Sequence, residues 1–69
     1  MPKYNLTGTE QIPDGAFVNL AAAGRVVDEA GMAHGRLYKG ESFQGCTIEE
    51  PERLQAGVVR GQLTMEESE

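Results

Sequence analysis

The feature that most limits the fold of this chain is its shortage of large apolar side chains. Leu, Ile, Val and Phe together make up about a fifth of the 69 residues, close to the composition at which chains begin to lose a stable core. A chain of this length also buries a smaller share of its surface than a longer one does. The sequence therefore predicts one small domain that needs further stabilisation.

Neither a disulfide nor a structural metal site is expected to supply that stabilisation. Cys46 is the only cysteine and His34 the only histidine, whereas a structural zinc site normally takes four such ligands. The nine glycines work against very stable local structure, because glycine loses the most conformational freedom on folding. We therefore expect no cofactor, and we expect surrounding copies or a partner surface to hold the protein.

The charge and hydropathy of the chain exclude several classes of protein. A net charge of −5, with six scattered basic residues, argues against nucleic acid as a direct ligand, because phosphate binding needs clustered Lys and Arg. No run approaches the ~18 apolar residues of a membrane span, and no secretory signal follows Met1. The lone thiol fits a reducing compartment, so we expect synthesis in the cytoplasm and no membrane contact.

The two ends of the chain are predicted to lie outside the domain. Residues 1–15 are mostly polar and end in the turn signal Pro13-Asp14-Gly15, in which proline presets φ and glycine accepts positive φ. We expect an N-terminal arm over residues 1–15, one β-rich domain over residues 16–65, and an acidic tail over residues 66–69.

Short strands predominate in the predicted domain. Glycine-containing turns separate four β-compatible runs, which are Ala16 to Ala23, Arg25 to Asp28, Met32 to Tyr38 and Ser42 to Gln44. Gly35 is interpreted as a bulge or bend within the third run. Gly45 and Cys46 are expected to close the fourth.

One short helix is predicted after Cys46. Thr47 and Glu50 have the spacing of a capping box, and the helix dipole favours the glutamates in the first turn. Proline is tolerated only in the first turn of a helix, so with Pro51 present the cap is either Thr47 or a residue nearer Glu49 or Glu50.

The sequence allows two positions for the end of this helix, each at a glycine. Gly57 and Gly61 are both able to terminate it in the left-handed conformation. Residues 62–65 then continue as a strand or extended segment. Together these elements predict a mainly β, small α+β fold of short strands and hairpins with one short C-terminal helix.

The second half of the chain carries an ordered set of signals: an aromatic residue, a glycine turn with an acidic residue, an acidic helix start, and Arg-Leu before a further glycine. These residues are Tyr38, Gly40, Glu41, Thr47, Glu49, Glu50, Arg53, Leu54 and Gly57. In this order they resemble a class of very small bacteriophage proteins encoded among virion structural genes. The resemblance implies a head or neck accessory role and no enzyme activity.

No catalytic or metal-binding site is predicted. His34 lies between Ala33 and Gly35 without a local partner, which favours a surface or turn histidine over a base, a ligand or a pH switch. Cys46 would need a base and a lowered pKa to act as a nucleophile, so we interpret it as a small semi-buried thiol. The glutamates of residues 49–52 are interpreted as a solvated helix start rather than a cation site.

We therefore predict a non-enzymatic structural component of a phage virion, either a capsid decoration (cement) protein or a head–neck accessory protein. Its expected partners are the major capsid protein or another virion protein, and copies of itself, after synthesis in the cytoplasm of the bacterial host. Apolar and aromatic side chains are expected to make these contacts; they are Phe17, Tyr38, Phe43, Leu54, Val58 and Leu63.

The alternative is a small acidic binding protein that inhibits a host nucleic-acid-binding factor, as anti-defence proteins do. Such an inhibitor presents Glu and Asp in rows at phosphate-like spacing. The acidic residues here cluster at residues 49–52 and 66–69 instead, which favours the structural component.

We predict that the isolated chain is poorly stable or self-associating, because its core-forming residues are few. Thermal melts combined with light scattering at low micromolar concentration check this expectation. A cooperative transition of a monomer above ~70 °C, beyond the usual range of mesophilic domains, would contradict it.

Overall fold

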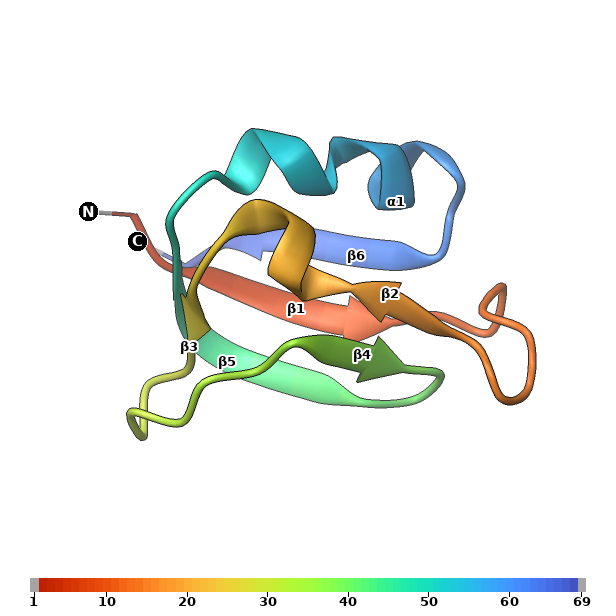
Figure 1. The fold of residues 1–69 in the computed structure, drawn as a ribbon, viewed down its shortest axis with the longest axis horizontal. Helices are drawn as coiled ribbons and strands as arrows, with labels where there is room; N and C mark the ends of the chain where they lie inside the picture. Colours follow the sequence, from red (N-terminus) through yellow and green to blue (C-terminus); the bar gives the residue numbers. More distant parts are fainter. Residues whose placement is uncertain (1, 69) are drawn as a thin grey trace.

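The protein is mainly β with one short helix near the C-terminus, as the sequence predicts. A computed structural model describes residues 2–68. The strands are β1 (Tyr4–Gly8), β2 (Phe17–Asn19), β3 (Val26–Val27), β4 (Arg36–Tyr38), β5 (Ser42–Ile48) and β6 (Leu63–Glu67). They form a four-stranded antiparallel sheet in the order β3-β5-β1-β6 and a two-stranded sheet of β2 and β4 (Figure 1).

The centre of the larger sheet is β1, which pairs antiparallel with β5 on one side and β6 on the other. Leu6 is fully buried, and Ile12 in the following loop is 1% exposed. The expectation that residues 1–15 form an arm outside the domain is therefore wrong. The polar residues Asn5 and Thr7 suggested an arm, but a strand needs apolar side chains on one face only, and strand pairing satisfies its backbone.

Gly8 connects the end of β1 to the turn after β4. Its N–H donates to the Glu41 carbonyl at 2.8 Å, and its own carbonyl accepts the Gly40 N–H at 3.0 Å. A Cβ atom at Gly8 would collide with the Tyr38 carbonyl. The absence of a side chain at this position therefore allows the second sheet to lie close to the first.

The strand β5 is longer than the sequence analysis predicts. Gly45 has a φ of 60° and lies where the pairing register between β1 and β5 shifts, with Tyr4 opposite Cys46 but Leu6 opposite Phe43. This irregularity is a β-bulge, which lets a strand pass a glycine instead of ending there. The prediction that Gly45 and Cys46 close the strand is wrong.

The predicted helix starts later than its capping box. Thr47 belongs to β5, and the helical segment consists of the 3₁₀ helix η2 (Pro51–Leu54) and the helix α1 (Gln55–Val59). Glu50 is the N-cap, without a side-chain hydrogen bond, and Pro51 stands in the first turn. Of the two alternatives for the cap, the one nearer Glu50 is confirmed, because Thr47 pairs with β3 instead.

The helix passes through Gly57 and ends before Gly61. The Arg60 N–H donates to the Ala56 carbonyl at 3.1 Å and the Gly61 N–H to the Val58 carbonyl at 3.0 Å. Gly61 has a φ of 77°, the left-handed conformation that commonly follows a helix. The later of the two predicted ends is therefore confirmed.

The predicted strand of residues 16–23 is only partly correct. It becomes β2 and then the 3₁₀ helix η1 (Leu20–Ala23). Asn19 ends the strand because its Oδ1 accepts the Ala21 N–H at 3.1 Å, the usual side-chain bond of a helix N-cap. The predicted strands ending at Asp28 and at Tyr38 correspond to β3 and β4.

The acidic tail predicted for residues 66–69 lies largely within the sheet. Glu66 and Glu67 belong to β6, opposite Asn5 and Tyr4 of β1, and the Ser68 N–H donates to the Lys3 carbonyl at 2.7 Å. The prediction is wrong for these residues because their side chains face outward while their backbone completes the pairing. Residue 69 lies outside the described residues.

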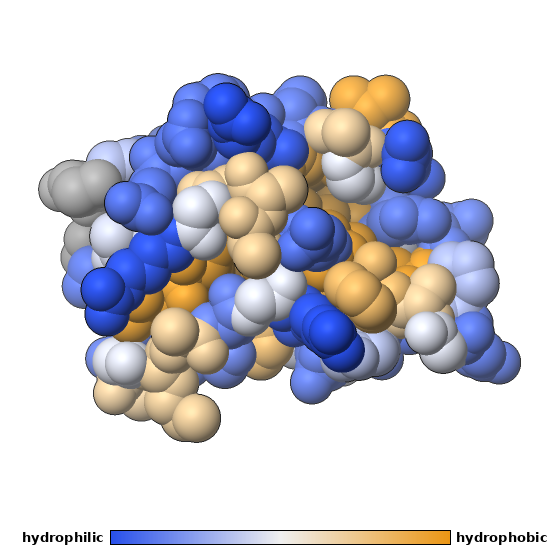
Figure 2. Space-filling model, viewed as in Figure 1, coloured by the Kyte–Doolittle hydropathy of each residue, from blue (hydrophilic) through white to orange (hydrophobic). Residues whose placement is uncertain are grey.

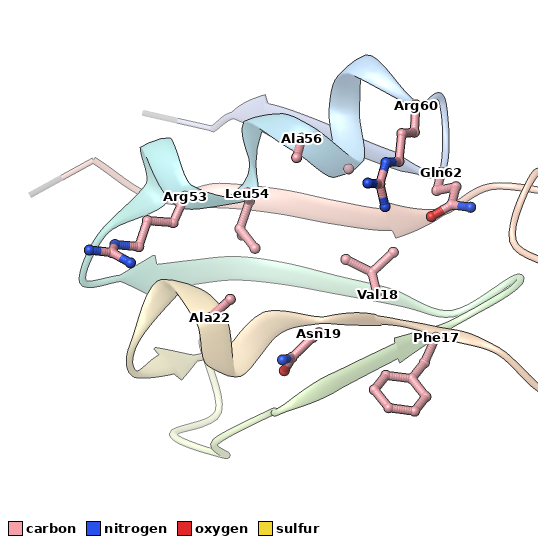
Figure 3. Close-up of a pocket in the computed structure, with 10 residues that line it drawn as sticks. Phe17, Val18, Asn19, Ala22, Arg53, Leu54, Ala56, Arg60 and Gln62 are labelled. Carbon is pink, nitrogen blue, oxygen red and sulfur yellow. The ribbon is translucent and has the colours of Figure 1, made fainter.

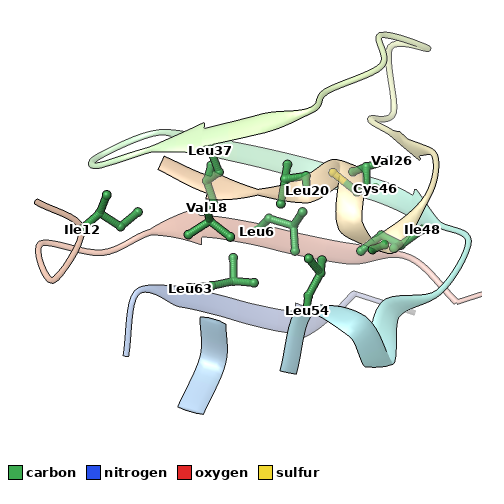
Figure 4. Close-up of a cluster of buried hydrophobic side chains, with 11 residues drawn as sticks. Leu6, Ile12, Val18, Leu20, Val26, Leu37, Cys46, Ile48, Leu54 and Leu63 are labelled. Atoms are coloured by element: carbon green, nitrogen blue, oxygen red, sulfur yellow. The ribbon is translucent and has the colours of Figure 1, made fainter. Parts of the chain in front are cut away.

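The core lies between the four-stranded sheet, the β2–β4 sheet and the helical segments (Figure 4). Buried apolar residues come from nearly every element; they are Leu6, Ile12, Val18, Leu20, Ala23, Val26, Leu37, Cys46, Ile48, Leu54 and Leu63. Among the described residues, no buried polar side-chain atom lacks a hydrogen-bond partner. The few large aliphatic residues of this chain are thus concentrated in one cluster.

None of the helices found in residues 2–68 is long and apolar enough to cross a membrane.

We predict that Leu6→Ala lowers the free energy of unfolding by about 2–5 kcal/mol, because it leaves a cavity in the core under β1. The control is Thr7→Ala in the same strand, where the side chain is exposed and the expected loss is below about 1 kcal/mol. Urea unfolding followed by circular dichroism measures both. Equal losses for the two variants would contradict the central position of β1.

Candidate functional site

A groove lies between β2 and the helical segment formed by η2 and α1 (Figure 3). Its volume is about 250 Å³. Val18 and Leu54 supply apolar surface, while Arg53 and Arg60 stand on the helical side. In Figure 3 the Arg60 side chain points from α1 toward β2. We call this feature the β2–α1 groove.

The hydrogen-bonding direction of β2 follows from the residues next to it. The Leu20 N–H donates to the Gly35 carbonyl at 2.9 Å. Val18, two residues before Leu20, lies opposite Leu37 in the same antiparallel register. Because hydrogen-bonded pairs alternate along an antiparallel ladder, Val18 and Leu37 form the hydrogen-bonded pair.

Phe17 and Asn19 therefore direct their backbone N–H groups away from β4. The residue opposite Phe17 is Tyr38, and its N–H donates to Glu41 Oε1 at 2.8 Å rather than to β2. No loop or turn hydrogen bond among residues 2–68 uses the Phe17 N–H, the Phe17 carbonyl or the Asn19 N–H. Since β2 lines the groove, one wall of the groove is the unpaired edge of a strand.

The outer face of the β2–β4 sheet carries an exposed aromatic pair. Phe17 is 40% and Tyr38 39% exposed, and their ring centroids lie 5.6 Å apart at an interplanar angle of 54°. The Arg36 guanidinium carbon lies 4.7 Å from the centroid of the Phe17 ring. Tilted aromatic pairs and cation–π contacts of this kind are both favourable. We call these three residues the Phe17–Tyr38 patch.

Three of the four arginines of this acidic chain surround the groove and the patch. Arg53 Nε lies 3.1 Å from Glu50 Oε1, in an exposed pair of the kind that contributes little to stability. No carboxylate within residues 2–68 forms an ion pair with Arg36 or Arg60. Figure 2 shows this face, where hydrophobic surface is visible in hollows between hydrophilic side chains.

Four of the six predicted contact residues lie at or near the surface. Phe17 and Tyr38 are adjacent on the exposed face described above. Phe43 and Val58 are partly buried and pack against the core. Whether any of the four contacts a partner stays a prediction.

The other two predicted contact residues are core residues. Leu54 is 3% and Leu63 2% exposed, and whether either of them contacts a partner stays a prediction. A chain with so few large aliphatic residues needs both of them to fill its interior. Leu54 also contributes to the lining of the β2–α1 groove.

None of the contact residues predicted from the sequence is an arginine. Arg53 and Arg60 are seven residues apart, a spacing that places two side chains on one face of a helix, so this signal was available. The position of Arg36 beside Phe17 depends on the pairing of β2 with β4, and no local pattern indicates it.

His34 has partners that the sequence analysis did not find, so the expectation of an isolated histidine is wrong. Its Nε2 lies 2.7 Å from Asp28 Oδ2, and its ring stacks on Phe43 with centroids 3.7 Å apart. Phe43 comes from β5, the strand after β4. The other oxygen of Asp28 accepts the N–H groups of Ala30 and Met32 at 2.9 and 3.1 Å. The arrangement closes the turn after β3.

The two ionisable groups of this region shift in opposite directions. The hydrogen bond from His34, followed by that from the Met32 N–H, holds the pKa of Asp28 below its ordinary value of about 3.8. Burial, and then the charges of Asp28 and Glu29, raises the pKa of the Cys46 thiol. Cys46 is fully buried, not semi-buried as predicted.

The acidic residues at the end of β5 have a structural role. Glu49 Oε1 accepts the Arg25 N–H at 2.6 Å and thereby connects β5 to the loop before β3. In the part of the chain that the structure describes, no group of three or more His, Cys, Asp or Glu is arranged to hold a metal ion.

We predict that Asp28→Asn lowers the melting temperature at neutral pH. The folded state lowers the pKa of Asp28, so the ionised carboxylate stabilises the fold above pH ~3.8, and this contribution is lost as the pH falls through the lowered value. Calorimetry across acidic pH should show the difference between wild type and variant shrinking there. Glu10→Gln, at an exposed position, is the control. A difference that does not change with pH would contradict the assignment.

The chain matches no protein-family model, and no match was found among curated proteins or solved structures.

Proposed function

We propose that this chain is a non-enzymatic, protein-binding structural component of a larger assembly. The type of assembly follows the resemblance of its second half to small phage proteins: a virion, in which the chain is a capsid decoration or head–neck accessory protein. The observation that carries the protein-binding part of the proposal is the Phe17–Tyr38 patch. The virion itself is proposed from the resemblance.

The patch has the composition of a protein-binding hot spot. Tyr and Arg are enriched among residues that dominate binding energy, and exposed aromatic rings are typical anchors. Arg36 is already held over the Phe17 ring, 4.7 Å from its centroid. A side chain that is ordered before binding loses less conformational entropy on association.

The surroundings of the two reactive side chains support a non-enzymatic role. His34 Nε2 is hydrogen-bonded to Asp28, and the His34 ring stacks on the Phe43 ring. The Cys46 thiol is buried and its pKa is raised, which is opposite to what a nucleophilic thiol requires.

We favour the structural component over the acidic inhibitor of a nucleic-acid-binding factor. The inhibitor would need rows of carboxylates on its binding face, whereas arginines line the groove. In the proposed role the chain is made in the cytoplasm of a bacterial host and is then carried in the virion, next to a capsid protein.

We predict that Phe17→Ala lowers the occupancy of the chain on assembled particles about tenfold, equivalent to about 1.4 kcal/mol. The control is Met32→Ala, because Met32 is 63% exposed but lies outside the patch. The measurement is the amount of tagged chain that co-sediments with virions in a density gradient. Wild-type chain found only in the fractions of free protein would contradict the virion assignment. Equal occupancy of the two variants would contradict the role of the patch.

A further inference from the structure

We infer that the β2–α1 groove receives an extended acidic segment of a partner protein, which adds as a strand to the free edge of β2. This inference rests on the proposed function as a protein-binding component, and it identifies the chemistry of one partner segment. It uses a surface other than the outer face of the patch.

The backbone of β2 supplies the first reason. The N–H and carbonyl of Phe17 and the N–H of Asn19 point away from β4 and line up along one edge. Groups at positions i and i+2 of a strand are those that a neighbouring antiparallel strand engages. Addition of an extended peptide to such an edge is a recurring mode of peptide recognition.

The shape of the groove supplies the second reason. Val18 and Leu54 give it apolar surface, and its volume of about 250 Å³ accommodates a side chain rather than a folded element. In a strand, alternate side chains point to the same side. A segment paired with Phe17 would therefore place one small apolar side chain in the hollow, and the side chains two residues before and after it would lie on the same side, at the rim.

The charge at the rim supplies the third reason. Arg60 points from α1 toward β2 (Figure 3), and no carboxylate in the described part of the chain pairs with it. A guanidinium group binds a carboxylate through paired hydrogen bonds. Since the chain as a whole carries a charge of −5, an acidic segment is attracted at this groove and repelled elsewhere, which favours one docking position.

The occupant is another protein rather than the acidic end of a second copy. Glu66 and Glu67 are paired in β6 with β1 of their own molecule, and the Ser68 N–H is bonded to Lys3. Breaking this pairing would disrupt the central sheet. Nucleic acid also offers anionic groups, but it does not pair with a strand edge.

The experiment titrates the full chain with a fluorescent, short synthetic peptide in which pairs of Glu alternate with pairs of Val, so that Glu and Val alternate along each face of the extended peptide. We expect saturable binding that weakens about tenfold in Arg60→Gln, the loss expected for hydrogen bonds to a charged group. Arg25→Gln is the matched control, because Arg25 is exposed and does not line the groove. Its binding should equal that of the wild type. Equal affinity of the two variants would overturn the inference.

Three further probes separate the mode of binding from simple charge attraction. A peptide N-methylated at alternate residues should lose binding, and hydrogen exchange of the Phe17 and Asn19 amides should slow with the unmodified peptide. A Gln-for-Glu peptide should bind about tenfold more weakly. Unchanged amide exchange, or tighter binding of an oligothymidylate than of the peptide, would overturn strand addition.

Peptide binding and particle occupancy together distinguish failure of the groove inference from failure of the proposed function. Loss of particle occupancy in Phe17→Ala together with no peptide binding by the wild type would retain the virion role and reject the groove inference. Peptide binding without co-sedimentation would retain the groove and reject the virion role.

Discussion

The pairing of β1 with both β5 and β6 is the interaction on which the rest of the structure depends. It joins the beginning of the chain to its second half, and it places Leu6 in the core. The bulge at Gly45 lets β5 continue past Cys46 to Ile48. The chain then leaves the sheet into η2 and α1, so the position of the groove follows from this pairing (Figure 1).

The small core also shapes the surface. All five leucines and both isoleucines are buried, while the exposed large apolar side chains include Phe17 and Tyr38, which lie on neighbouring strands. Because aromatic rings in a non-hydrogen-bonded cross-strand pair come close together, the same register that leaves the edge of β2 unpaired also brings these rings into contact. The groove and the patch therefore have a common origin.

The three residues of β2 present groups in three different directions. The Val18 side chain packs into the core, the Phe17 side chain forms the outer patch, and the backbone of Phe17 and Asn19 faces the groove. A strand has these three directions because its side chains alternate while its hydrogen-bonding groups lie in the plane of the sheet. A protein with little surface can in this way carry two contact regions on one short segment.

The sequence by itself determined the features that depend on neighbouring residues. These were the mainly β class, the turn at Gly40, the end of a strand at Tyr38 and the helix near the C-terminus, because local conformational preferences decide them. Only the tertiary structure decided that residues 1–15 contain the central strand, that Phe43 stacks on His34, and that Arg60 faces β2. These contacts join distant segments, and their register depends on the whole core rather than on any local pattern.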